Sequence, residues 1–103
     1  MKILVIEPQK PPYSKDISGT LEEIQAIVGG YIQATYPFDD PTALVCNEEG
    51  KLIGLPQNRI ICDRSGRIYD IICGTFFLVG LGAEDFISLT DSEIEKYSQF
   101  FRA

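Results

Sequence analysis

The chain has 103 residues and a formal net charge of −6 at pH 7, and 45% of its residues are hydrophobic. That length and composition predict one domain, residues 1–103, with a single hydrophobic core. An acidic chain repels a phosphate backbone, so we expect no nucleic acid partner. No apolar run approaches the roughly 18 residues of a membrane span, and a proline follows the first run too early for a signal peptide. We therefore expect a cytoplasmic protein with no membrane partner.

Histidine is absent, and the three cysteines show no CxxC spacing. The commonest metal ligand and general base is thus missing, which excludes zinc sites and nucleophiles paired with histidine. We expect no catalytic residue, metal or cofactor, and hence a protein that is not an enzyme. A carboxylate-based hydrolase stays open, but no spacing singles out a pair of carboxylates. The odd cysteine count in apolar segments predicts reduced, buried thiols at Cys46, Cys62 and Cys73.

The first third of the chain predicts a strand, a helix and a second strand. The β-branched residues 2–7 favour a buried opening strand, and the proline-rich segment 8–16 is a loop or at best an edge. Thr20 then begins a capping box, apolar residues follow at helical spacing, and Gly29 is a left-handed stop. Residues 31–38 are typical of a strand that leaves this helix.

Two hairpins are predicted in the middle of the chain. Residues 43–54 place two apolar runs around an Asn-Glu-Glu-Gly turn, and residues 59–72 repeat the pattern around an Asp-Arg-Ser-Gly turn. A further apolar strand is expected over 73–82. Residues 89–101 show a second capping box, at Thr90, and an amphipathic stripe. The predicted fold class is α+β, a mainly antiparallel sheet with two helices packed on it.

Asn58 and Arg59 stand where the next strand should open with apolar residues. At a strand mouth, the planar guanidinium of Arg59 could clamp a phosphate or carboxylate, while the Asn58 amide reads a base or ribose edge. The structural alternative has Asn58 capping the local turn and Arg59 pairing with Asp63, Asp70 or another surface carboxylate. Residue types alone favour the structural alternative.

Four further residues are candidates for ligand binding. Gly74 and Thr75 interrupt an apolar stretch, which indicates a bulge or a close neighbour with a hydroxyl beside it. Tyr31 and Tyr36 belong to a patch of aromatic and acidic residues. Such aromatics stack on a base, anchor a protein partner or cap the open end of a sheet.

The order of motifs also carries a family resemblance. An opening strand that ends in Glu-Pro is followed by T-L-E-x-x-Q-x-x-V-G-G-Y-I, YPFDDP, C-N-E-E-G-K, G-L-P-x-N-R and G-T-F-F-x-V-G. From Lys2 to about Tyr97, the chain resembles a family of small bacterial and phage proteins, the domain of unknown function 3846. The resemblance includes Asn58 and Arg59 but implies no catalytic residues. It implies cargo of phages, plasmids and conjugative elements in Firmicutes and similar hosts, often near antirestriction genes.

This implied setting favours a non-enzymatic protein that acts against host defence. The first expectation is that it binds and sequesters a small anionic ligand, such as a nucleotide signal, near Asn58, Arg59 and Thr75. The alternative is an acidic inhibitor that docks onto a host defence protein in the host cytoplasm and blocks it. Whether the chain forms a homo-oligomer is left open.

Overall fold

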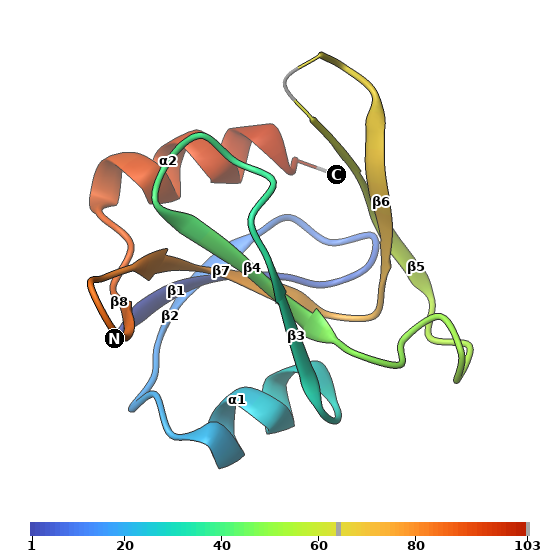
Figure 1. The fold of residues 1–103 in the computed structure, drawn as a ribbon, viewed down its shortest axis with the longest axis horizontal. Helices are drawn as coiled ribbons and strands as arrows, with labels where there is room; N and C mark the ends of the chain where they lie inside the picture. Colours follow the sequence, from blue (N-terminus) through green and yellow to red (C-terminus); the bar gives the residue numbers. More distant parts are fainter. Residues whose placement is uncertain (64, 103) are drawn as a thin grey trace.

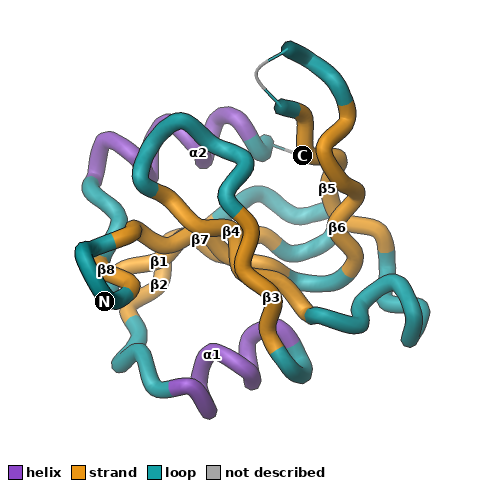
Figure 2. The backbone as a smooth tube through the Cα atoms, viewed as in Figure 1, coloured by secondary structure: helices purple, strands orange, loops and turns teal. Residues whose placement is uncertain are grey.

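The computed structural model describes residues 1–63 and 65–102 and has the predicted α+β fold, dominated by antiparallel strands (Figure 1). Its elements are, in chain order, β1 Lys2–Ile6, β2 Tyr13–Asp16, α1 Leu21–Val28, β3 Ile32–Thr35, β4 Thr42–Asn47, β5 Gln57–Cys62, β6 Ile68–Cys73, β7 Phe76–Leu81, β8 Phe86–Ile87 and α2 Asp91–Phe100. The main sheet has the strand order β2-β1-β7-β4-β3, with β8 also paired to β7. Strands β5 and β6 form a separate two-stranded ribbon (Figure 2).

The two helices cover opposite faces of the main sheet, with α2 above it and α1 below it in Figure 1. The strand register explains the two cores. Leu4, Leu78 and Leu44 are neighbours across β1, β7 and β4, and all three lie in the core under α2. Alternation along each strand sends the adjacent row to the other face, where it packs against α1. That row consists of Val5, Phe77 and Val45.

Both helices begin at the predicted caps. The Thr20 hydroxyl oxygen accepts from the main-chain N–H of Glu23 at 3.2 Å, and Gly29, with φ +81°, ends α1 in the left-handed conformation. The capping box is complete only at α2, where Thr90 and Glu93 each accept from the main-chain N–H of the other. Neither helix in residues 1–63 and 65–102 is long and apolar enough to cross a membrane.

The hairpin predicted over 43–54 is wrong. Its first half is β4, which pairs with β3 and β7. Its second half forms turns in which the Ile53 N–H donates to the Glu49 carbonyl at 3.0 Å. Residues 51–54 supply only two adjacent apolar side chains and no alternating face to bury, so Leu52 is left 86% exposed.

The second predicted hairpin, over 59–72, is confirmed as β5 and β6, although Arg64 in its turn lies outside the described residues. The ribbon stands at the side of the main sheet in Figure 1. Ile61 and Ile72 point from it into the core under α2. The segment 8–16 contains β2, which is an edge strand of the main sheet. This agrees with the prediction of a loop or at best an edge, since proline is tolerated at the edge of a sheet.

Candidate functional site

Arg59 uses every N–H of its guanidinium group inside the protein. Nε and Nη2 donate to the carbonyl oxygen of Phe101 at 3.1 and 3.0 Å, and Nη2 also donates to the carbonyl of Lys10 at 2.8 Å. Nη1 donates to the carbonyl and the side-chain oxygen of Asn58 at 3.2 and 2.9 Å. A guanidinium has five N–H donors, so none is left over. Phe101 is the C-cap of α2, where the helix dipole favours a cation.

Asn58 connects the ribbon to two further segments. Its Nδ2 donates to the carbonyl of Ile6, at the end of β1, and to the carbonyl of Gly74, between β6 and β7, both at 2.8 Å. Gly74 has φ +84°, a conformation that suits glycine. Together, Asn58 and Arg59 tie the ribbon to β1, to the start of β7 and to the end of α2. We call this pair and its partners the junction.

The junction matches neither interpretation of the pair from the sequence. Asp63 accepts from the amides of its own turn, and Asp70 binds Lys51, so neither carboxylate pairs with Arg59. The half-buried guanidinium does line a shallow hollow of about 450 Å³, but its donors face carbonyl oxygens. Burial lowers the pKa of Arg59 from its usual value. That hollow is lined by Gln9, Asn58, Arg59 and Arg102.

The other predicted ligand residues are dispersed. Gly74 belongs to the junction, and Thr75 follows it before β7. Tyr31 and Tyr36 lie just outside the two ends of β3, an edge strand, and are 68% and 59% exposed. Tyr36 lines another hollow, of about 340 Å³, with residues of the β7–β8 connection. Neither tyrosine lines the hollow at Arg59.

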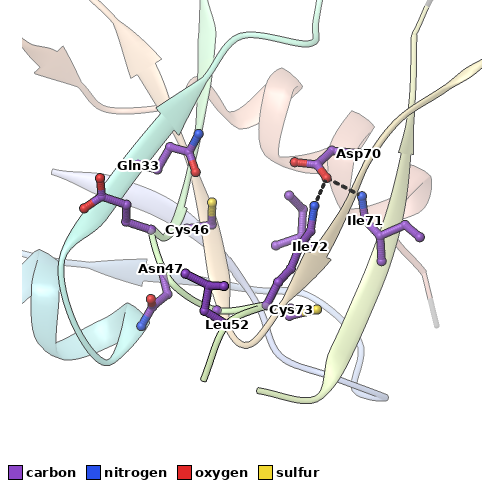
Figure 3. A pocket seen from close by; sticks show the side chains of 11 residues that line it. Gln33, Cys46, Asn47, Leu52, Asp70, Ile71, Ile72 and Cys73 are labelled. Atoms are coloured by element: carbon purple, nitrogen blue, oxygen red, sulfur yellow. Dashed lines mark hydrogen bonds and ion pairs between the residues drawn. The ribbon is translucent and has the colours of Figure 1, made fainter. Parts of the chain in front are cut away.

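A cleft that the sequence did not indicate lies between β6 and the β3–β4 pair. Figure 3 shows Gln33 and Asp70 on its two sides, with Cys46 between them. The cleft has a volume of about 330 Å³, and its walls come from β3, β4, β6 and the loop after β4. Segments this far apart in the chain leave no local pattern. The residues that line it are Gln33, Cys46, Asn47, Glu48, Gly50, Lys51, Leu52, Asp70, Ile71, Ile72 and Cys73.

The polar groups of the cleft are a salt bridge, two amides, a carboxylate and two thiols. Lys51 Nζ donates to Asp70 Oδ1, and this bond raises the pKa of Lys51. Oδ1 of Asp70 also accepts from the main-chain N–H of Ile71 at 2.7 Å. Burial, with Asp70 nearby, raises the pKa of the Cys46 thiol, so the thiol is neutral at ordinary pH.

The prediction that all three cysteines are buried is wrong in part. All three are free thiols, and Cys46 is buried, but Cys73 is half-buried and Cys62 is exposed. Cys62 ends β5 one position after the core residue Ile61, so alternation turns its side chain away from the core. No group of three His, Cys, Asp or Glu side chains suited to a metal occurs within residues 1–63 and 65–102.

Asp40 fastens the loop after β3 to α2. Its Oδ2 accepts from Lys96 Nζ at 2.7 Å and from the Tyr97 hydroxyl at 2.8 Å. Both bonds lower the pKa of Asp40 below its ordinary 3.8, and the bond from Lys96 has the larger effect. A carboxyl whose folded pKa is lowered contributes stability above its unfolded pKa and loses that contribution as pH falls through the folded value.

We therefore expect Asp40→Asn to unfold at a lower urea concentration than the wild type at neutral pH, and the difference to narrow below about pH 4. Urea titrations across this pH range measure the effect. Glu95→Gln is the matched control on the exposed face of α2 and should show no such pH-dependent difference. A difference that stays constant down to about pH 2 would exclude the Asp40 carboxylate as its source.

Comparison with known proteins supplies a family. A family model described as a domain of unknown function, DUF3846, matches residues 1–102. The searches of curated proteins and of solved structures each found no match. The matched range includes both the junction and the cleft, and it confirms the resemblance seen in the motifs. The setting in phages and mobile elements stays a prediction. The chain belongs to the DUF3846 family.

Proposed function

We propose that the protein is a non-catalytic binding protein that docks onto another protein through the ribbon. The observation that carries this proposal is an uncovered apolar surface, which we call the ribbon face and define as Leu52, Ile60, Ile68 and Ile71. Leu52, Ile60 and Ile68 are 86%, 57% and 64% exposed, and Ile71 between them is half-buried. Exposed apolar patches on small proteins mark interaction sites more often than chance.

The ribbon face is one surface and not four scattered side chains. Ile60 and Ile71 are direct cross-strand partners, so they lie on the same face of the ribbon. Ile71 and Ile68 line one hollow of about 400 Å³. Ile71 also lines the cleft of Figure 3 together with Leu52. A partner that covers this surface removes apolar area from water. Each Å² buried contributes a favourable free energy of about 25 cal/mol, from which the costs of association are subtracted.

The charge of the chain indicates the kind of partner. With a formal net charge of −6, the protein is drawn to a basic surface and repelled by an acidic one. In the setting that the family resemblance implies, that partner is a host defence protein in the host cytoplasm, and the protein acts by blocking it.

The test compares the wild type with Ile60→Ser/Ile68→Ser. Immobilised wild type should retain a protein from host lysate, and the purified partner should bind the variant at least about tenfold more weakly in calorimetry. Ile87→Ser is the matched control, because Ile87 is 50% exposed but lies on β8. Circular dichroism checks that the variants fold. Equal binding by the double variant, or loss in the control alone, would refute docking through the ribbon face.

A small anionic ligand such as a nucleotide is the second candidate. It is favoured by the hollow at the junction, where Arg59 and Arg102 line one surface and Arg59 pairs with no carboxylate of residues 1–63 and 65–102. Because the Arg59 donors are occupied, Arg102 and Gln9 would make the direct contacts. A thermal-shift screen against cyclic and linear nucleotides tests this candidate. It fails if no nucleotide raises the melting temperature, or if Arg102→Ala leaves the shift unchanged.

A further inference from the structure

We propose that the cleft between β6 and the β3–β4 pair receives an arginine side chain of the partner protein. This inference rests on the proposed docking function and names the contact that would anchor it. The cleft opens beside the ribbon face, since Leu52 and Ile71 belong to both. Arginine side chains that enter a pocket are among the groups that dominate protein interfaces.

The cleft presents oxygen acceptors on more than one wall. Asp70 directs Oδ1 at Lys51 and at the next main-chain N–H, whereas no partner for Oδ2 occurs in the part of the chain that the structure describes. Gln33, across the cavity in Figure 3, contributes an exposed amide. Glu48 adds an exposed carboxylate from the loop after β4. A planar guanidinium, with five N–H donors, can satisfy several such oxygens at once, which the compact ammonium of lysine cannot do as well.

The charges around the cleft select a cation. Glu48 and Asp70 carry two negative charges against the one positive charge of Lys51 among the lining residues. The Cys46 thiol between the walls is neutral. A phosphate would therefore be repelled here, so the cleft is no second site for a nucleotide.

The apolar part of the cleft suits the stem of an arginine. Leu52, Ile71 and Ile72 line it together with the polar groups. The methylene groups of an arginine pack on such side chains while the charged end reaches the oxygens. The volume of about 330 Å³ accommodates one side chain and not a folded segment.

The test uses N-acetyl-arginine amide as the probe and its neutral isostere, N-acetyl-citrulline amide, as the control. Titrated to about 50 mM, the arginine probe should give saturable changes in amide NMR spectra at Gln33, Cys46, Asp70 and Cys73. Glu48→Gln should weaken this binding about tenfold, equivalent to roughly 1.4 kcal/mol. Glu49→Gln, the adjacent carboxylate outside the cleft, should change it far less.

Several results would overturn the inference. They are equal changes with the citrulline probe, changes centred outside the cleft, no saturation, or full binding by Glu48→Gln. The variant Ile60→Ser/Ile68→Ser separates this inference from the proposed function. It should still bind the arginine probe but should no longer bind the partner protein. Partner binding without probe binding refutes the arginine site alone. Probe binding by a protein that captures no partner refutes the docking function alone.

Discussion

Arg59→Ala should lower the free energy of unfolding by about 2–4 kcal/mol, which is large for a residue that is only half-buried. The substitution leaves the carbonyl groups of Lys10 and Phe101 without their donor and removes the cation from the end of α2. Hydrogen bonds to a charged group are worth more than neutral ones, and here several share one side chain. Urea unfolding followed by circular dichroism measures the loss.

Two variants sharpen this result. Arg59→Lys keeps the charge at the helix end but loses the planar fork, so its stability should fall between those of the wild type and the alanine variant. Arg67→Ala removes an exposed arginine from the same ribbon and should change stability by no more than about 0.5 kcal/mol. If Arg59→Ala is as stable as the wild type and loses a nucleotide-induced thermal shift, the residue is an anion clamp and its structural role is refuted.

The parts of the fold that the sequence predicted are those with local signals. Each helix carries a hydroxyl and a carboxylate at cap spacing, with apolar residues at helical spacing after them, and the glycine at position 29 has the positive φ that ends α1. The ribbon has a turn between two apolar runs. In each case the residues that make the contact are neighbours in the chain, so the pattern alone is sufficient.

The errors occur where distant segments decide the outcome. The predicted hairpin needed residues 51–54 to pair with β4, but β3 and β7 occupy both edges of β4, so no edge of β4 is left for them. Apart from the adjacent Asn58, the partners of Arg59 are main-chain carbonyls 42 and 49 positions away in the chain. Every residue has a carbonyl, so no residue type marks these acceptors. The carboxylates Asp63 and Asp70 were therefore predicted instead, because their charge is opposite to that of Arg59.

The cleft was missed for the same reason. Of its lining residues, the sequence singles out two cysteines, Asp70 and the Asn-Glu-Glu-Gly turn at 47–50, and each has an ordinary structural explanation. What makes them a candidate site is that β6 crosses beside β4 and sets Asp70 opposite Gln33. That proximity is a property of the ribbon's placement, and the junction at Asn58 and Arg59 fixes the placement.

Asn58→Ala should lower the free energy of unfolding by about 2–3 kcal/mol. The carbonyls of Ile6 and Gly74 each lose a donor, and Arg59 loses a side-chain acceptor. The matched control is Gln57→Ala. Gln57 is the exposed residue before Asn58, and its loss should change stability by no more than about 0.5 kcal/mol.

The double variant Asn58→Ala/Arg59→Ala tests whether the two residues act as one junction. Each single substitution already weakens the attachment of the ribbon to β1 and α2. Adding the second substitution should therefore lower the free energy of unfolding by less than that substitution does in the wild type. We expect a coupling energy of about 1 kcal/mol or more from a double-mutant cycle in urea. Hydrogen exchange should locate the effect, with faster exchange in β5, β6 and the last turn of α2 and little change in α1, which packs on the other face. Additive costs, or faster exchange confined to residues 58 and 59, would mean that the two side chains make independent local contacts and that something other than this pair positions the ribbon.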